Sequence, residues 1–196
     1  GGQIAWFLPF ALVGAVFSLW RWHDNRTLRA AVIIFIGWVL LFGGIFSFSK
    51  GIYHSYYTSA LAPGIAAMVG IGVVAFADLI KRHYLWIGGV IVAAGVTIWA
   101  QFTVSNRFTD FFSSVPNWTL VVVCFGIAVL VVAALQKRLP VTLGLAIVVA
   151  GLLLIPAEWS QYETAHAALN TTLPQAGPRE GAAGRSFGSN AFDTGV

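Results

Sequence analysis

Long apolar runs recur along this chain of 196 residues and constrain its fold more than any other feature. A helix of about 20 residues, rising by about 1.5 Å per residue, is long enough to cross a hydrocarbon core of about 30 Å. Charged residues make up only 9% of the chain, against roughly 25% in soluble domains. The sequence therefore predicts an all-α integral membrane protein with about six transmembrane helices, over residues 4–20, 30–48, 59–80, 84–102, 118–136 and 140–156.

The basic residues predict the orientation of these helices. Alternate loops hold Arg21, Arg26, Arg29, Lys81, Arg82, Lys137 and Arg138. The loops on the other side hold only Lys50 and Arg107. The positive-inside rule then places the basic loops in the cytoplasm and both termini outside. Because the basic residues are spread through short loops and form no patch, we expect no nucleic-acid partner.

Composition divides the chain into two parts. Residues 1–157 form the predicted transmembrane region, and residues 158–196 form an external linker or tail. After residue 174 the tail is rich in Gly, Ala, Ser and Asn without periodicity, which predicts a flexible and disordered segment. The first residue is Gly1 and Met68 is the only methionine, so we expect a piece of a longer chain.

The ionisable residues suggest no catalytic group within the chain. No Asp, Glu, His or Arg falls in the middle of a predicted span, which disfavours a transporter. Asp78 and Lys81 lie at a helix end, where snorkelling or a local pair accounts for them. His23 and His166 lack companion ligands, so no metal site is expected. We expect five external acids to be solvated charges: Asp110, Glu158, Glu163, Glu180 and Asp193.

Residues 47–58 form the most informative polar segment, at the predicted external end of two spans. The segment contains one lysine, one histidine, three tyrosines and several hydroxyl groups. A fixed cation and neutral donors at the membrane surface suit a lipid-linked phosphate. Alternatively, the tyrosines form an ordinary aromatic belt and Lys50 snorkels. These residues alone leave both interpretations open.

The order of residues in this segment adds a resemblance. The stretch FSFSKGIYHSYYTSALAPGIAAMVG resembles the Ser-x-x-Lys-Gly-x-x-x-x-Tyr stretch, followed by a proline, of the GT-C membrane glycosyltransferases. Similar enzymes include the aminoarabinose transferase of lipid A and members of glycosyltransferase family 39. The opening GGQIAWFLPFALVG and the tail LPQAGPREGAAGRSFG look more particularly like bacterial mannosyltransferases of the YkcA/B type.

The resemblance implies a function for the parent protein. Such enzymes transfer a sugar, mannose or pentose-like, from a polyprenyl-phosphate donor to a lipid or glycan acceptor on the external face of the bacterial cytoplasmic membrane. It implies that Tyr56 contacts the donor phosphate and that Lys50 belongs to the Lys-Gly pair of the motif, with His54 and Tyr57 as neighbouring donor contacts.

The same resemblance limits what this chain does alone. The catalytic acid of related enzymes lies in a first external loop, which we expect outside this chain, so we expect the fragment alone to be inactive. No cofactor is expected within the chain, although a divalent metal ion in a longer parent enzyme stays open. The alternative function is a non-enzymatic membrane scaffold or assembly subunit, favoured by charge-free spans and abundant small residues. A scaffold would bind partners through its helix faces and have no affinity for polyprenyl phosphates.

Overall fold

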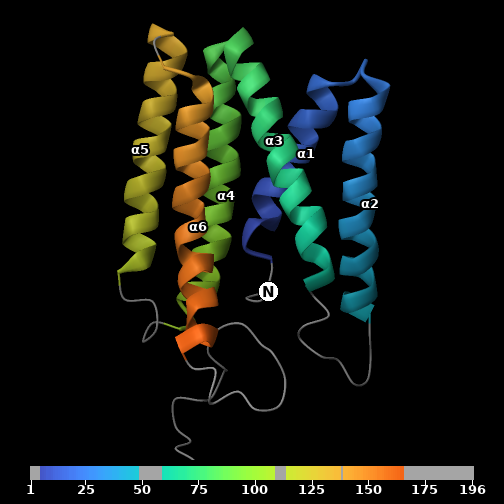
Figure 1. Cartoon of the computed structure of the whole chain (residues 1–196), viewed down its shortest axis with the longest axis vertical. Coiled ribbons are helices and arrows are strands. Elements are labelled where there is room, and N and C mark those ends of the chain that lie inside the picture. Colours follow the sequence, from blue (N-terminus) through green and yellow to red (C-terminus); the bar gives the residue numbers. More distant parts are fainter. Residues whose placement is uncertain (1–4, 49–58, 109–113, 138, 166–196) are drawn as a thin grey trace, which may run out of the picture.

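The protein is built from helices that run up and down between two ends (Figure 1). The computed structural model describes residues 5–48, 59–108, 114–137 and 139–165, with only the backbone for 162–165. The elements are η1 (Ala5–Phe7), α1 (Leu8–Arg21), α2 (Arg26–Phe48), α3 (Ala62–Arg82), η3 (Tyr84–Trp86), α4 (Ile87–Ser105), α5 (Val115–Gln136) and α6 (Val141–Ala165). No strand occurs among the described residues, which confirms the all-α membrane fold.

Five helices are long and apolar enough to cross a membrane. They cover Arg26–Phe48, Ser59–Arg82, Tyr84–Ser105, Val115–Gln136 and Val141–Gln161. The first predicted span is a shorter apolar helix, Ala5–Arg21. Its α-helical part has 14 residues, a length of about 21 Å, because a 3-10 turn precedes Leu8. Five of the predicted crossings are therefore supported by length, whereas the first helix falls short of the hydrocarbon thickness.

The two ends of the helix bundle differ in charge. We call the end with residues 22–25, 83–86 and 137–140 the basic end, which lies at the top of Figure 1. It carries the described cations Arg21, Arg26, Arg29, Lys81, Arg82 and Lys137. The opposite end, where α2 finishes and α3 begins, carries Arg107. The start of α1 and the finish of α6 both point towards the opposite end (Figure 1).

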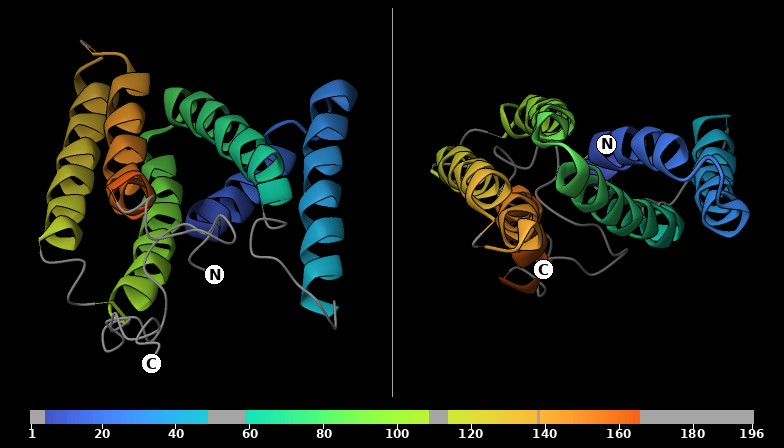
Figure 2. Two further views of the ribbon diagram at one scale, coloured as in Figure 1. Left: turned by 60° about the horizontal axis from the view of Figure 1, so that its bottom comes forward. Right: turned by 90° about the horizontal axis from the view of Figure 1, so that it is seen from above.

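Glycines set the closest helix contacts. Viewed along the bundle, α2 and α5 lie at opposite edges, with α1, α3 and α4 between them (Figure 2). A Cβ added at Gly72 of α3 would lie 2.9 Å from the Cα of Gly14 in α1, so the two backbones touch at this crossing. Gly64 packs against α2, whereas Gly70 faces open space. Only some of the small residues of α3 therefore serve helix packing.

The α5–α6 hairpin has a continuous glycine seam. A Cβ at Gly126 would meet the backbone nitrogen of Val148 at 2.8 Å, and one at Gly144 would meet Leu130 at 2.7 Å. Gly151 comes equally close to Val123. The contacts alternate between the two helices at spacings of three and four residues, which is the repeat of one helix face. The hairpin turns at Lys137, which has a left-handed backbone with φ of 55°.

Helix α6 does not end at Pro156, where we placed the end of the last span. It continues to Ala165 with Pro156 in its interior. A proline cannot donate the backbone hydrogen bond to the carbonyl four residues earlier, here that of Leu152. The side chain of Gln101 in α4 donates to that carbonyl instead, with Nε2 3.0 Å from the oxygen. The helix thus crosses the predicted boundary between residues 157 and 158, while the division into two domains stays a prediction.

The acidic residue at the basic end of α3 has a distant partner. Asp78 Oδ2 lies 3.3 Å from Nη2 of Arg21, the last residue of α1. The pair joins α1 to α3 and is half-buried, with side-chain exposures of 19% and 35%. We expected snorkelling or a local pair for Asp78, but its partner Arg21 lies on another helix, 57 residues away in the sequence. Lys81 is exposed.

Candidate functional site

The residues predicted to bind the donor phosphate lie outside the described part of the chain. Lys50, His54, Tyr56 and Tyr57 all fall within residues 49–58. The structure does place both flanks of this segment. Helix α2 ends at Phe48 and the described chain resumes at Ser59, both at the opposite end of the bundle. The assignment of these four residues stays a prediction.

A tryptophan of α2 fixes the chain where the segment ends. Trp38 Nε1 donates a hydrogen bond to the carbonyl oxygen of Ala60, at 2.8 Å. Gly64, in the first turn of α3, lies close to α2 at the same place. A Cβ added at Gly64 would meet the Trp38 ring at 2.9 Å and the Val39 side chain at 3.0 Å. The first turn of α3 is therefore tightly packed against α2, directly after the predicted phosphate-binding residues.

An apolar cavity of about 280 Å³ opens beside the first turns of α3. Its walls come from η1, α3 and α6, and consist of Phe7, Ala62, Ile65, Ala66, Val69, Val149 and Leu153. All of these side chains are hydrocarbon, so nothing in the wall requires a polar ligand. A cavity of this composition suits a flexible hydrocarbon chain.

A polar and aromatic cluster lies at the same end of the bundle. The rings of Trp6 and Trp159 meet edge to face with centroids 5.5 Å apart, and Phe108 meets Trp159 at 5.0 Å. Gln101 is 1% exposed and also donates to the carbonyl of Trp6, at 3.4 Å. Among the described residues, Trp6 Nε1 and Gln101 Oε1 are buried without a hydrogen-bond partner. The cluster fastens the start of the chain to α4 and α6.

Glu158 differs from the expectation of a solvated external acid. The residue lies inside α6, because the helix continues past Pro156. Its Oε2 atom is buried and has no hydrogen-bond partner among the described residues. The sequence predicted the end of the last span at Pro156 and so placed Glu158 in the tail, and no local signal indicates that Gln101 donates to the carbonyl of Leu152 there. Across the described residues, no three His, Cys, Asp or Glu side chains gather to hold a metal ion.

Comparison with known proteins adds two relatives. The chain is 33% identical, over its whole length, to the Bacillus subtilis protein named putative mannosyltransferase YycA. It is 30% identical, over 90% of its length, to putative mannosyltransferase YkcB of the same organism. The chain spans 29% of the first relative and 25% of the second.

The other two comparisons found nothing. No protein-family model matches the chain, and no solved structure matches it. The relationship therefore rests on these two curated proteins, and both carry the same description. The resemblance to mannosyltransferases of the YkcA/B type, inferred from three separate motifs, is confirmed, and this chain is similar along its length to part of the two relatives.

Proposed function

We propose that this chain forms the later membrane part of a glycosyltransferase that moves a sugar from a polyprenyl-phosphate donor to an acceptor of the cell envelope. The observation that carries the proposal is the apolar cavity of about 280 Å³ beside the first turns of α3. The residues of α3 that line it come directly after the segment with the predicted phosphate contacts in the sequence. The similarity to two mannosyltransferases supports the same class of reaction.

The cavity supplies a place for part of the lipid tail of the donor. Polyprenyl phosphates join a long apolar chain to a charged group, so their site needs a hydrocarbon wall next to a cation. Ala62 and Ala66 line the cavity one helical turn apart. Their small side chains leave the space open, and the flanking Ile65 and Val69 supply contact area. Lys50, twelve residues before Ala62 in the sequence, supplies the cation.

The proposed chemistry is a single displacement at the sugar. The bond from C1 of the sugar to the phosphate oxygen breaks as the bond from C1 to the acceptor oxygen forms. The acceptor hydroxyl gives its proton to a carboxylate that lies outside this chain. Lys50 and Tyr56 stabilise the charge that develops on the leaving phosphate, with His54 and Tyr57 as further contacts.

The proposed location is the bacterial cytoplasmic membrane, with the active face outside. The basic end carries Arg21, Arg26, Arg29, Lys81, Arg82 and Lys137, whereas the opposite end carries Arg107 among the described residues. The positive-inside rule therefore favours a cytoplasmic basic end. The proposed donor and acceptor then meet at the external surface.

Binding of an undecaprenyl-phosphate sugar tests the phosphate assignment. The full-length protein is placed in nanodiscs, and wild type is compared with Lys50→Ala and Tyr56→Phe. Lys81→Ala and Tyr84→Phe serve as matched controls, because they make the same changes at the basic end, where both side chains are exposed. We expect binding to fall at least tenfold in the first pair and to stay unchanged in the second. Equal effects in the two pairs would remove the assignment.

A second comparison tests the tail site separately. Ala66→Leu adds bulk inside the cavity, whereas Ala146→Leu adds the same bulk on an exposed part of α6 that does not line it. We expect Ala66→Leu to weaken an undecaprenyl-phosphate donor and to leave binding of a short-chain analogue unchanged. If wild type binds no polyprenyl phosphate of any length, the scaffold function replaces the glycosyltransferase.

A further inference from the structure

A second cavity lies at the basic end, far from the proposed donor site. Its volume is about 560 Å³, and it is formed by the end of α1, the turn that follows, the start of α2 and the end of α3. Three guanidinium groups line it, from Arg21, Arg26 and Arg82. Each of these arginines comes from a different helix, so the fold itself gathers three positive charges around one space.

The positive charges of this basic cavity are only partly neutralised. Arg21 uses Nη2 to pair with Asp78, while its Nε is buried without an acceptor among the described residues. Arg26 and Arg82 are exposed, and neither forms an ion pair with any described residue. The cavity thus retains positive charge after its internal pairs are made.

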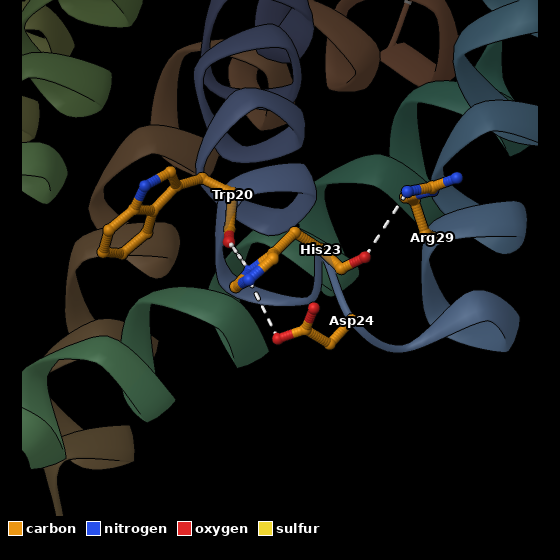
Figure 3. A network of polar contacts seen from close by, with 4 residues as sticks. All are labelled: Trp20, His23, Asp24 and Arg29. Atoms are coloured by element: carbon orange, nitrogen blue, oxygen red, sulfur yellow. Dashed lines mark hydrogen bonds and ion pairs between the residues drawn. The ribbon is translucent and has the colours of Figure 1, made fainter.

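The wall of the basic cavity also contains the carboxylate of Asp24, which pairs with His23. Asp24 Oδ2 lies 2.8 Å from Nε2 of His23, and His23 Nδ1 lies 3.1 Å from the carbonyl oxygen of Trp20 (Figure 3). Arg29 Nη1 donates to the carbonyl oxygen of His23, at 3.4 Å. These contacts hold the turn between α1 and α2 and direct Asp24 towards His23. The arginines around the cavity are therefore left available for an external anion.

An apolar groove of about 400 Å³ continues from the basic cavity between α2 and α3. Trp22 and Leu28 line both spaces, so the two are neighbours. The groove wall also includes Ala31, Gly70, Ile71 and Val74, with Asp78 at its edge. Gly70 leaves the groove open, because a Cβ added there would meet nothing within 4 Å. A charged pocket and an apolar groove therefore lie next to each other at the basic end.

We propose that this combined site binds one anionic phospholipid, with its phosphate among Arg21, Arg26 and Arg82 and one acyl chain in the groove. A surplus of positive charge beside lipid favours an anionic headgroup over a zwitterionic one. A water-soluble phosphate would use the arginines but not the apolar groove. The site lies at the other end of the bundle from the proposed donor, so the bound lipid is distinct from the substrate.

The experiment measures lipid retention by native mass spectrometry of the full-length protein. Dioleoyl phosphatidylglycerol is compared with dioleoyl phosphatidylcholine, which has the same chains, and with glycerol phosphate, which has none. We expect selective retention of phosphatidylglycerol. Arg26→Gln and Arg82→Gln should each weaken it about fivefold, because a basic side chain near the membrane surface contributes on that scale. Lys137→Gln, at the same end but outside the cavity, should have no effect.

The groove is tested by filling it. Gly70→Leu adds a side chain in the groove, where the new Cβ meets nothing within 4 Å, and Gly95→Leu makes the same change on α4, where the new Cβ also meets nothing within 4 Å. We expect only Gly70→Leu to reduce phosphatidylglycerol binding, by at least fivefold. Equal retention of the two phospholipids would overturn the proposal. The proposal would also be overturned if glycerol phosphate binds, if this binding depends on the arginines, and if Gly70→Leu leaves it unchanged. The site would then bind a soluble anion without using the groove.

Discussion

The side-chain amide of Gln101 takes the place of the backbone N–H that Pro156 lacks: its Nε2 lies 3.0 Å from the carbonyl oxygen of Leu152. In a regular helix this oxygen would accept from residue 156. A proline inside a helix costs about 3 kcal/mol, in part because that acceptor is left unpaired. The contact explains how α6 passes through a proline in the membrane, and it ties α4 to α6 at the same point.

Removing this amide should destabilise the protein in a way that depends on Pro156. We expect Gln101→Leu to lower the free energy of unfolding by about 1 to 2 kcal/mol, since it leaves a buried carbonyl without a donor. In a Pro156→Ala background residue 156 donates to Leu152 itself, so the cost should fall by about half. Unfolding by SDS titration in mixed micelles measures both values in one double-mutant cycle.

Thr97→Val is the control for this cycle. Thr97 is buried in the same helix as Gln101, but its hydroxyl donates to the carbonyl of Ala93 within α4, at 2.7 Å. Its cost should be the same in both backgrounds. If Gln101→Leu lowers the free energy of unfolding equally with Pro and with Ala at position 156, the amide does not replace the N–H that Pro156 lacks.

One methyl group added at the crossing of α1 and α3 should lower the stability of the protein. We expect Gly72→Ala to cost about 1 to 3 kcal/mol, because the new Cβ would lie 2.9 Å from the backbone of Gly14 and the helices must move apart. Gly37→Ala makes the same change where nothing lies within 4 Å and should be neutral or slightly stabilising. Thermal unfolding in detergent compares the two, and similar melting shifts would contradict the packing argument.

The hydrogen bond from Trp38 should matter for donor binding although Trp38 itself is not proposed to touch the donor. Trp38→Phe keeps an aromatic ring but removes the Nε1–H that holds the carbonyl of Ala60. One such bond contributes about 0.5 to 1.5 kcal/mol, so we expect a twofold to tenfold loss in affinity for the polyprenyl-phosphate donor. Trp118→Phe, at an exposed site on α5, should leave the affinity unchanged. A loss of equal size in both variants would argue against a positioning role.

The orientation of the bundle can be read by cysteine labelling in cells. Cys124 is exposed on α5, so it is first replaced by Ser to remove the background. Asn106→Cys then places a thiol at the opposite end and Gln136→Cys at the basic end, both at exposed positions. A membrane-impermeant maleimide should label the first in intact cells and the second only after permeabilisation. The reverse pattern would invert the proposed topology.

Apolar length made most of the fold predictable, whereas the orientation inferred from charge asymmetry stays a prediction. Runs of about 20 residues identify membrane helices because the bilayer sets their length, whatever the neighbouring helices are. Exact helix ends were harder to predict. Helix α2 begins at Arg26, four residues before the expected start, because the Oδ1 atom of Asn25 accepts a hydrogen bond from the backbone N–H of Leu28, at 3.0 Å, and caps the helix there.

Contacts between distant helices account for what the sequence did not predict. Nothing near Asp78 indicates that its partner is Arg21, and nothing near Pro156 indicates that Gln101 replaces the missing N–H. Both contacts depend on how the helices pack against one another. The predicted phosphate contacts, by comparison, rest on a local motif, and Lys50, His54, Tyr56 and Tyr57 lie outside the described residues.

The glycine seam between α5 and α6 has a consequence for biogenesis. At Gly126, Gly144 and Gly151 the two helices come so close that each covers backbone which would otherwise face lipid. Only residues 137–140 separate the helices, so the ribosome delivers both in quick succession. We expect the pair to leave the insertion machinery as one preassembled unit that later docks on α4. A substitution in the seam would then act early, lowering the yield of inserted protein before it changes any property of the finished protein.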